Sequence, residues 1–274
     1  MPLSTLVYSR PAETPKNKAT PITKPPTQPP SIERPKAVTP EVHAGTEARH
    51  QLFNEISKAG QAQLVFLGDS ITEGWESSGS RIWEQHYASR KAANFGVSGD
   101  RTEHVLWRLD HGNFDGLTPK LIVVLIGTNN TRHRQDSGAD TAAGVQAILD
   151  RLTLKCPDAK VLLMAIFPRG ENTDDPLRVL NNEANKSIEK IADGKRVIFK
   201  DIGALFTEAD GTLKQSLMPD LRHPNEQGYA VWADAIEADV VALLDEAKPN
   251  AKPNTDPKRK DAVKPASPQD GKPN

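Results

Sequence analysis

The stretch VFLGDSITEGW, Val65–Trp75, changes abruptly from apolar to polar residues. Three apolar residues lead into Gly68, and Asp69 and Ser70 follow at once. A short continuous apolar run that ends at a glycine is typical of a strand buried on both faces. A serine directly after such a strand would stand at the edge of a sheet where parallel sheets bind their ligands.

Four further apolar runs repeat this pattern, and stretches with helical spacing of apolar residues separate them. The predicted strands are QLVFLG (63–68), AANFG (92–96), LIVVLIG (121–127), KVLLMAIF (160–167) and RVIFKDI (196–202). The predicted helices cover 40–60, 80–90, 101–112, 137–155, 175–194 and 224–247. Strands that alternate with helices predict an α/β fold, a parallel sheet with helices on both faces, because parallel neighbours need crossover connections.

The net charge of −1 hides two basic ends around an acidic middle. Residues 1–40 hold six Lys or Arg and two acidic residues, and residues 248–274 hold seven and three. Of 35 basic and 36 acidic residues in all, 22 and 31 therefore remain in residues 41–247, a net charge of −9. The ends also hold 16 of the 22 prolines, which predicts disordered tails. We expect one folded domain over 41–247, whose negative charge disfavours nucleic acid as a partner.

The sequence offers no sign of a membrane or secretory segment. No run of about 18 apolar residues occurs, and the N-terminal region lacks the basic start and apolar stretch of a signal peptide. We therefore expect no transmembrane segment and a cytoplasmic location, with a secreted or periplasmic one as the alternative if the true start lies upstream. The single cysteine, Cys156, excludes an intramolecular disulfide and a cysteine-rich zinc site.

Several common catalytic motifs are absent. The sequence contains no G-x-S-x-G nucleophile elbow, no G-x-x-x-x-G-K-[ST] or G-x-G-x-x-G nucleotide loop and no H-E-x-x-H metal motif. The histidines are scattered, and we expect His104 and His111 on a solvated helix face or just past its end. No metal dependence is expected.

A second candidate group lies late in the chain, in MPDLRHPNEQGYAVWADAI (218–236). Asp220 precedes His223 by three residues, just before the last predicted helix. On a turn, this spacing can bring the carboxylate to Nδ1 of the imidazole and leave Nε2 free to accept a proton from a serine. An isolated D-x-x-H, like an isolated GDS, is also compatible with a surface turn or a helix cap.

Two loops after other predicted strands offer hydrogen-bond donors for an oxyanion. NFGVSGDRT (94–102) contains glycines that let a backbone approach a ligand closely. VLIGTNNTRH (124–133) contains Asn129, whose side-chain amide can donate beyond the strand end. Arg132, His133 and Arg134 are interpreted as solvated loop residues, and the alternative is that they add to a polar rim of the site.

Four blocks resemble those of the GDSL or SGNH hydrolase superfamily. They are GDSI (68–71), NFGVSGD (94–100), IGTNN (126–130) and DLRHP (220–224), in the superfamily's order, and the likeness extends over about residues 60–245. The region from NFGVSGD to IGTNN, followed by FPRGEN (167–172), is especially similar to the catalytic subunits of intracellular platelet-activating-factor acetylhydrolases and their bacterial relatives. The resemblance implies a three-layer α/β/α, flavodoxin-like fold with five parallel strands, no cofactor and a possible homodimer.

The resemblance also implies a role for each matching position. Ser70 would be the nucleophile, His223 the general base and Asp220 the residue that orients His223. The backbone N–H groups of Ser70 and Gly99 and the side chain of Asn129 would form an oxyanion hole. The implied activity is that of a serine esterase that cleaves short-chain, acetyl-type carboxylic esters through an acyl-serine intermediate. The alternative is a noncatalytic protein that binds a glycan or a partner on the same scaffold.

Contacts with a small-molecule ester are expected from Ile71, Thr128 and Arg222. Arg222 departs from the family pattern, in which the acetylhydrolase subunits have an apolar residue just before the base. A guanidinium there would favour a carboxylate or phosphate on the substrate, so we expect acetylated sugars or small acetyl esters as much as a lipid-like ester. Asp69 is interpreted as structural, with its carboxylate turned away from Ser70 to accept backbone N–H groups.

Overall fold

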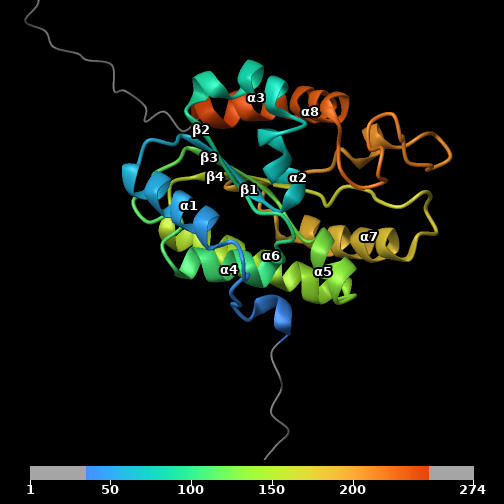
Figure 1. Ribbon diagram of the computed structural model, residues 1–274, viewed down its shortest axis with the longest axis horizontal. Coiled ribbons are helices and arrows are strands. Elements are labelled where there is room, and N and C mark those ends of the chain that lie inside the picture. The colour runs from blue at the N-terminus through green and yellow to red at the C-terminus, as the bar shows by residue number, and fades with distance from the viewer. Residues whose placement is uncertain (1–34, 247–274) are drawn as a thin grey trace, which may run out of the picture. The chain divides into compact units, whose positions relative to one another are not determined.

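The computed structural model of the chain describes residues 35–246. At its centre lies a five-stranded, all-parallel sheet with the strand order β2-β1-β3-β4-β5 (Figure 1). The strands are β1 (Leu64–Gly68), β2 (Ala92–Gly96), β3 (Leu121–Leu125), β4 (Lys160–Met164) and β5 (Val197–Lys200). Each strand lies within one of the predicted apolar runs, and the predicted α/β fold class is confirmed.

Helices cover both faces of the sheet. The α-helices in this part of the chain are α1 (Glu47–Ala59), α2 (Ser70–Glu73), α3 (Ser80–His86), α4 (Thr102–Asp110), α5 (Thr128–His133), α6 (Gly138–Lys155), α7 (Pro176–Ile188) and α8 (Glu226–Glu246). The 3₁₀ helices are η1 (Lys36–Val38), η2 (Gly74–Glu76), η3 (Ala88–Arg90), η4 (Glu189–Ile191) and η5 (Gly203–Phe206). Helices α1, α4, α6 and α7 pack on one face, and α2, α3 and α8 pack on the other (Figure 1).

Successive side chains of each strand enter the two cores in turn, because they point to opposite sides of the sheet. In β1, Val65 and Leu67 belong to the core beneath α1, α4, α6 and α7. Leu64 and Phe66 belong to the core beneath α3 and α8. Both sets are almost completely buried, which explains why the strand is a continuous apolar run in the sequence.

An aromatic cluster fills the core on the α8 side. Trp75 in η2 lies against Trp232 of α8, with ring centroids 4.9 Å apart, and against Trp83 of α3 at 6.0 Å. Phe66 of β1 contacts Trp83 and Tyr87 from the sheet side, at 5.2 and 4.8 Å. Because η2 directly follows α2, the cluster supports the segment that begins at the end of β1.

The strand order brings the carboxyl ends of β1, β2 and β3 side by side. Gly68 at the end of β1 pairs in register with Gly96 of β2 and Leu125 of β3. The chain passes from β1 to β2 on one side of β1, and β3 lies on the other side. The strand order thus reverses at β1. Such a reversal opens a crevice beyond the strand ends, where open parallel sheets bind their ligands.

The first helix begins later than predicted. It was expected from residue 40, but α1 starts at Glu47, and residues 35–46 form an N-terminal arm instead. The arm is bound along its length, because N–H of Glu41 donates to the carbonyl of Glu103 (3.1 Å) and Oγ1 of Thr102 donates to the carbonyl of Ala37 (2.8 Å). Such long-range contacts cannot be deduced from local helical spacing.

The short helices α2 and α5 were not predicted as helices. They have four and six residues and begin directly after β1 and β3. Elements of one or two turns are too short to show a helical period of apolar residues. Both stand at the strand ends where the sequence placed its candidate site loops.

The predicted tails fall almost entirely outside the described residues. The exception is residues 35–40, where η1 buries Ala37 at 1% exposure. The disorder of the tails and the domain boundaries at 41 and 247 stay predictions. Within residues 35–246, no helix has the length and apolar character needed to cross a membrane.

Candidate active site

The serine that follows β1 begins a helix at the sheet edge. Gly68 ends the strand, and a Cβ there would lie 2.2 Å from the carbonyl oxygen of Leu125, so the adjacent strand leaves no room for a side chain. Asp69 caps α2, since its Oδ1 accepts the N–H of Ile71 (2.9 Å). Ser70 is thus the first residue of α2 and is partly exposed beyond the carboxyl end of β1.

The loop before α8 brings a histidine to this serine. Oγ of Ser70 lies 2.9 Å from Nε2 of His223, although the two residues are 153 positions apart. On the other side of the ring, Nδ1 of His223 lies 2.6 Å from Oδ2 of Asp220. A hydroxyl, an imidazole and a carboxylate in this sequence can transfer the hydroxyl proton to Nε2 and stabilise the resulting imidazolium.

The turn from Asp220 to His223 explains how a three-residue spacing achieves this contact. Oδ1 of Asp220 accepts the N–H groups of Arg222 (3.0 Å) and His223 (2.6 Å), which folds the carboxylate back over the turn. Leu221 takes the left-handed conformation, φ 60°, uncommon for a residue with a side chain, and its carbonyl accepts the N–H of Gly170 (3.0 Å). Burial alone would raise the pKa of Asp220, but hydrogen bonds from the backbone and ring of His223 outweigh it and hold this pKa below its ordinary value. Asp220 is therefore an anion at neutral pH.

A hydrogen bond ties α8 directly to α2. Tyr229, in the first turn of α8, donates from its hydroxyl to the carbonyl of Ile71 at 2.7 Å, and both residues are buried. Gly74 at the end of α2 allows this approach, because a Cβ there would lie 2.0 Å from the tyrosine hydroxyl. The helix that carries the serine and the helix that follows the histidine loop are thus in direct contact.

The predicted oxyanion donors lie after the neighbouring strands. Gly99, in the loop after β2, has φ 82°, a conformation that favours glycine. Within residues 35–246, the backbone N–H groups of Gly99 and Ser70 donate to no acceptor. Asn129 is the second residue of α5, and its Nδ2 donates to the carbonyl of Asp100 (3.0 Å), which fixes the amide and leaves its second N–H available.

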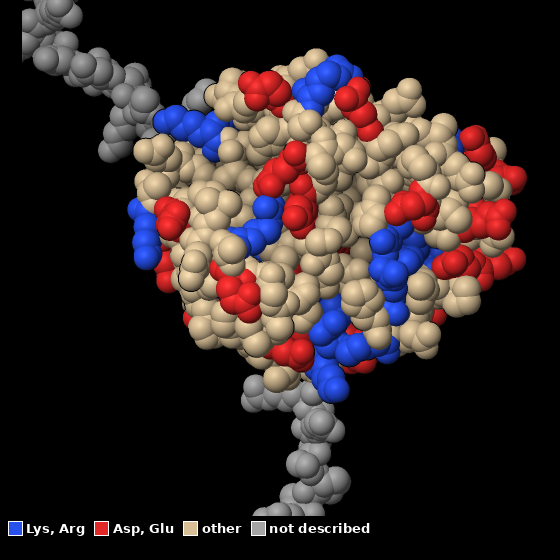
Figure 2. Space-filling model, in the orientation of Figure 1, with Lys and Arg blue, Asp and Glu red and all other residues tan. Residues whose placement is uncertain are grey.

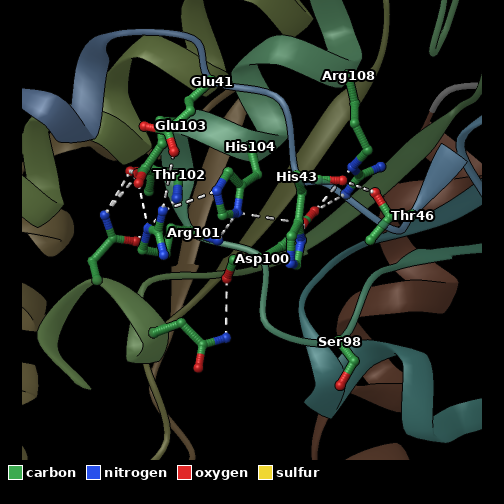
Figure 3. Close-up of polar contacts among 12 residues, drawn as sticks. Glu41, His43, Thr46, Ser98, Asp100, Arg101, Thr102, Glu103, His104 and Arg108 are labelled. Atoms are coloured by element: carbon green, nitrogen blue, oxygen red, sulfur yellow. Dashed lines mark hydrogen bonds and ion pairs between the residues drawn. The ribbon is translucent and has the colours of Figure 1, made fainter. Parts of the chain in front are cut away.

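Buried charges brace the loop that carries Gly99 (Figure 3). The carboxylate of Asp100 is fully buried; Oδ2 accepts from Nε of Arg108 (2.9 Å), and Oδ1 lies 2.8 Å from Nδ1 of His43. The His43 ring belongs to the N-terminal arm and covers Gly99, with Cε1 3.2 Å from the position of a Cβ there. The loop is therefore held by α4 on one side and by the arm on the other.

His43, Asp100 and His104 are the one group within residues 35–246 that could hold a metal ion, with ligand atoms within 4.8 Å of one another. Hydrogen bonds already hold these groups, since Nδ1 of His104 accepts the N–H of Arg101 (3.2 Å) and Asp100 is bound to Arg108 and His43. The guanidinium groups of Arg101 and Arg108 lie beside these atoms and would repel a cation. We interpret the group as a brace for the loop.

The prediction that His104 lies on a solvated helix face is wrong, whereas His111 is exposed just past α4, as predicted. His104 is 3% exposed and stacks on His43 with ring centroids 4.4 Å apart. Burial lowers the pKa of His104 to about 4, so its imidazole is neutral. The arm that covers this face of α4 is what the helical spacing could not reveal.

Asp69 is buried at 1% exposure and accepts the N–H of Ile71, which agrees with its interpretation as a structural residue. Burial raises its pKa to about 7 from an ordinary value of 3.8. The native state therefore retains a proton that the unfolded chain releases near pH 4, so Asp69 makes the protein less stable as the pH rises from about 4 to about 7.

We expect Asp69→Asn to remove this pH-dependent loss while it keeps the cap, since the Asn oxygen accepts the same N–H. Each pKa unit corresponds to about 1.4 kcal/mol, so the stability of the variant relative to the parent should rise by more than 1 kcal/mol between pH 5 and pH 8. Denaturant unfolding of both proteins at the two pH values measures the change. If the difference in unfolding free energy between variant and parent does not change with pH, the buried carboxylate of Asp69 does not cause the pH-dependent loss of stability.

Of the three predicted substrate contacts, Arg222 lines a cleft, whereas the side chains of Ile71 and Thr128 are buried. Ile71 is 2% exposed, and its side chain belongs to the core beneath α8. Thr128 is 3% exposed, and its hydroxyl accepts from Nη1 of Arg169 (3.2 Å). Both side chains thus lie behind the surface of the site, while their roles toward a substrate stay predictions.

Sequence reasoning assigned no role to Arg169, which follows β4 in the segment FPRGEN. The same rule that identified Ser70, a polar residue just beyond the carboxyl end of a strand, could have found it. Arg132, interpreted as part of a solvated loop, lies near the end of α5 and lines the same cleft as Arg169 and Arg222. That proximity depends on the packing of α5 against two separate loops and has no local sequence signal.

Comparisons with known proteins show the family and the fold of the chain. Residues 66–231 match the model of the GDSL-like lipase/acylhydrolase family. The human platelet-activating factor acetylhydrolase IB subunit alpha1 is 32% identical over 209 residues, which cover 76% of this chain and 88% of that protein. Among solved structures, a GDSL-like lipase from Bacteroides thetaiotaomicron is similar with a TM-score of 0.55 at 21% identity, over 73% of this chain and 98% of that one. The acetylxylan esterase Axe2 from Geobacillus stearothermophilus has a TM-score of 0.52 at 19% identity, over 68% and 96%.

Proposed function

Because the chain belongs to the GDSL-like lipase/acylhydrolase family, we propose that it is a serine esterase that cleaves short-chain, acetyl-type carboxylic esters through an acyl-serine intermediate. The observation that carries the proposal is the 2.9 Å contact between Oγ of Ser70 and Nε2 of His223. A binding protein has no use for a base at the hydroxyl of a partly exposed serine. In this proposal Ser70 is the nucleophile, His223 the base and Asp220 the residue that orients it.

Acylation begins when Oγ of Ser70 attacks the ester carbonyl and its proton passes to Nε2 of His223. Asp220 holds the proton on Nδ1, which keeps Nε2 free to accept, and its negative charge stabilises the imidazolium. The carbonyl oxygen becomes an oxyanion, which the N–H groups of Ser70 and Gly99 and the amide of Asn129 stabilise. His223 then gives its proton to the departing alkoxide, and the alcohol leaves.

Deacylation uses the same groups in reverse. Nε2 of His223 takes a proton from a water molecule as the water attacks the acyl carbonyl. The three donors stabilise the second oxyanion, and Ser70 recovers its proton when the acid leaves. No step requires a metal or an organic cofactor.

The names of two similar proteins support an acetyl group as the acyl part. One is an acetylhydrolase and the other an acetylxylan esterase. The compounds in the two names differ: platelet-activating factor in one and xylan in the other. The shared acetyl group supports the proposed acyl part of the substrate. The alcohol part has to be inferred from the residues of this chain.

Hydrolysis of p-nitrophenyl esters from acetate to octanoate by the purified full-length chain tests the proposal. We expect kcat/KM to be highest for acetate and to fall as the acyl chain lengthens. Release of p-nitrophenol is followed by absorbance, with Ser78→Ala as a control, since Ser78 is an exposed serine on the loop before α3. Absence of hydrolysis for every ester would favour a noncatalytic binding function, and a maximum at octanoate would contradict the acetyl preference.

A further inference from the structure

A cleft lies directly beside the histidine of the candidate site. It has a volume of about 240 Å³, and three arginines, Arg132, Arg169 and Arg222, supply its basic side chains. Its wall also includes Asp220 and Leu221, which precede His223 in the same turn. Figure 2 shows basic side chains gathered to the right of centre, near α5 and the loops beyond the sheet as Figure 1 places them.

No carboxylate of the described residues forms an ion pair with any of these three arginines. Arg169 is 8% exposed, and its Nη1 donates to the carbonyl and the hydroxyl of Thr128, both neutral groups. Burial and the neighbouring guanidinium groups lower the pKa of both Arg169 and Arg222. Arginines that are buried or close together are normally paired, so these donors lack an anion.

The carboxylates near the cleft are already occupied. Asp175 caps α7 by accepting the N–H groups of Leu177 (3.0 Å) and Arg178 (2.9 Å). Asp220 is engaged with the backbone and ring of His223. The cleft therefore has three guanidinium groups facing two carboxylates that other bonds hold, and it carries a net positive charge.

The position of the cleft indicates which part of an ester would reach it. In the proposed mechanism His223 protonates the leaving oxygen, so the alcohol part of the ester must lie on the histidine's side of the site. The cleft is lined by Asp220, Leu221 and Arg222, the three residues that directly precede His223 in the turn. Its volume is below the roughly 300–1,000 Å³ of pockets that enclose a whole ligand, which suits a single charged group.

We propose that Arg132, Arg169 and Arg222 bind an oxyanion, such as a carboxylate, carried by the alcohol part of the ester. This inference rests on the proposed esterase function and names its substrate class: acetyl esters of anionic alcohols, for which an acetylated acidic sugar is one chemical type. A planar guanidinium can bind a carboxylate through two hydrogen bonds. Such binding would fix the alcohol with its ester oxygen beside Nε2 of His223.

The test compares two acetyl esters that differ in charge, 4-acetoxybenzoate and its methyl ester. The measured quantity is the ratio of kcat/KM for the anionic ester to that for the neutral one, which cancels effects on the chemistry common to both. We expect Arg222→Gln and Arg132→Gln each to lower this ratio by about tenfold, the scale of one charge-assisted hydrogen bond. Arg222→Lys should restore part of it, because the charge remains while the two-pronged geometry is lost.

Arg151→Gln is the matched control. It removes the same charge from α6, where Arg151 pairs with Asp110 away from the cleft. The ratio should stay within about twofold of the parent, since screening weakens a charge beyond about 10 Å. An unchanged ratio in both cleft variants, or an equal fall in Arg151→Gln, would overturn the proposal.

A binding measurement separates this proposal from the proposed esterase activity. Calorimetric titration with 4-hydroxybenzoate and with methyl 4-hydroxybenzoate needs no turnover. We expect the parent protein to bind the anion more tightly and Arg222→Gln to lose that difference. If the anion is bound but neither ester is cleaved, the esterase function fails and the cleft's assignment as an anion site stands; equal binding of the two compounds by the parent refutes the anion site.

Discussion

Ser70→Ala is expected to abolish the formation of an acyl-enzyme. Among the residues that the structure describes, Ser70 supplies the one oxygen that His223 contacts at Nε2, so its loss leaves the base without a nucleophile to activate. In hydrolases of this mechanism, loss of the serine lowers kcat on the order of 10⁶-fold, and the remaining rate comes from the oxyanion donors and substrate binding. A loss of that order should be measurable with p-nitrophenyl acetate after correction for spontaneous hydrolysis.

Mass spectrometry gives the second readout for this variant. A sample quenched during turnover should show one acetyl group on the peptide that contains Ser70 in the parent and none in Ser70→Ala. Ser78→Ala should behave as the parent in both measurements. An acetylated Ser70→Ala protein would assign the nucleophile to another residue.

Asn129→Ala should lower kcat by roughly 10²- to 10³-fold with little change in KM. The side-chain amide donates most strongly to the charged oxygen of the transition state, so its loss affects turnover more than ground-state binding. The variant also loses the bond from Nδ2 to the carbonyl of Asp100, which we expect to cost about 1 kcal/mol of stability. Steady-state kinetics and thermal unfolding separate the two effects.

Asn182→Ala provides the control, because Asn182 is exposed on α7. It should leave kcat, KM and the unfolding midpoint close to those of the parent. A fall of less than tenfold in kcat for Asn129→Ala would remove this residue from the oxyanion hole. A large rise in KM at constant kcat would instead make Asn129 a residue of ground-state binding.

The fold could be predicted because the strands of a parallel sheet are buried on both faces and therefore form continuous apolar runs in the sequence. Val65 and Leu67 face one core and Leu64 and Phe66 the other, so β1 is apolar throughout and its boundary at Gly68 is sharp. The same holds for β3, where all five residues are buried. What the local pattern could not supply was the start of α1, because the contacts of His43 and Ala37 with distant residues decide the path of the N-terminal arm.

Some residues of the candidate site could likewise be predicted from local sequence, and others depend on tertiary packing. Ser70 and Asn129 follow strand ends, and Asp220 and His223 share one short turn, so each had a local signal. His104 had the helical context of a surface residue, and only the arm that covers it makes it buried. Arg132 comes from α5, and Arg169 and Arg222 come from two separate loops, so their common cleft results from tertiary packing alone.

The aromatic cluster next to α2 has a further use as an optical reporter. Trp75, Trp83 and Trp232, three of the four tryptophans, lie together in it. The fourth, Trp107, is on α4, across the sheet, where it stacks on His111 with ring centroids 4.1 Å apart. Intrinsic fluorescence of a Trp107→Phe protein would thus report on the surroundings of the helix that begins at Ser70. Acylation of Ser70 could then be followed by tryptophan fluorescence, including with esters whose products do not absorb visible light.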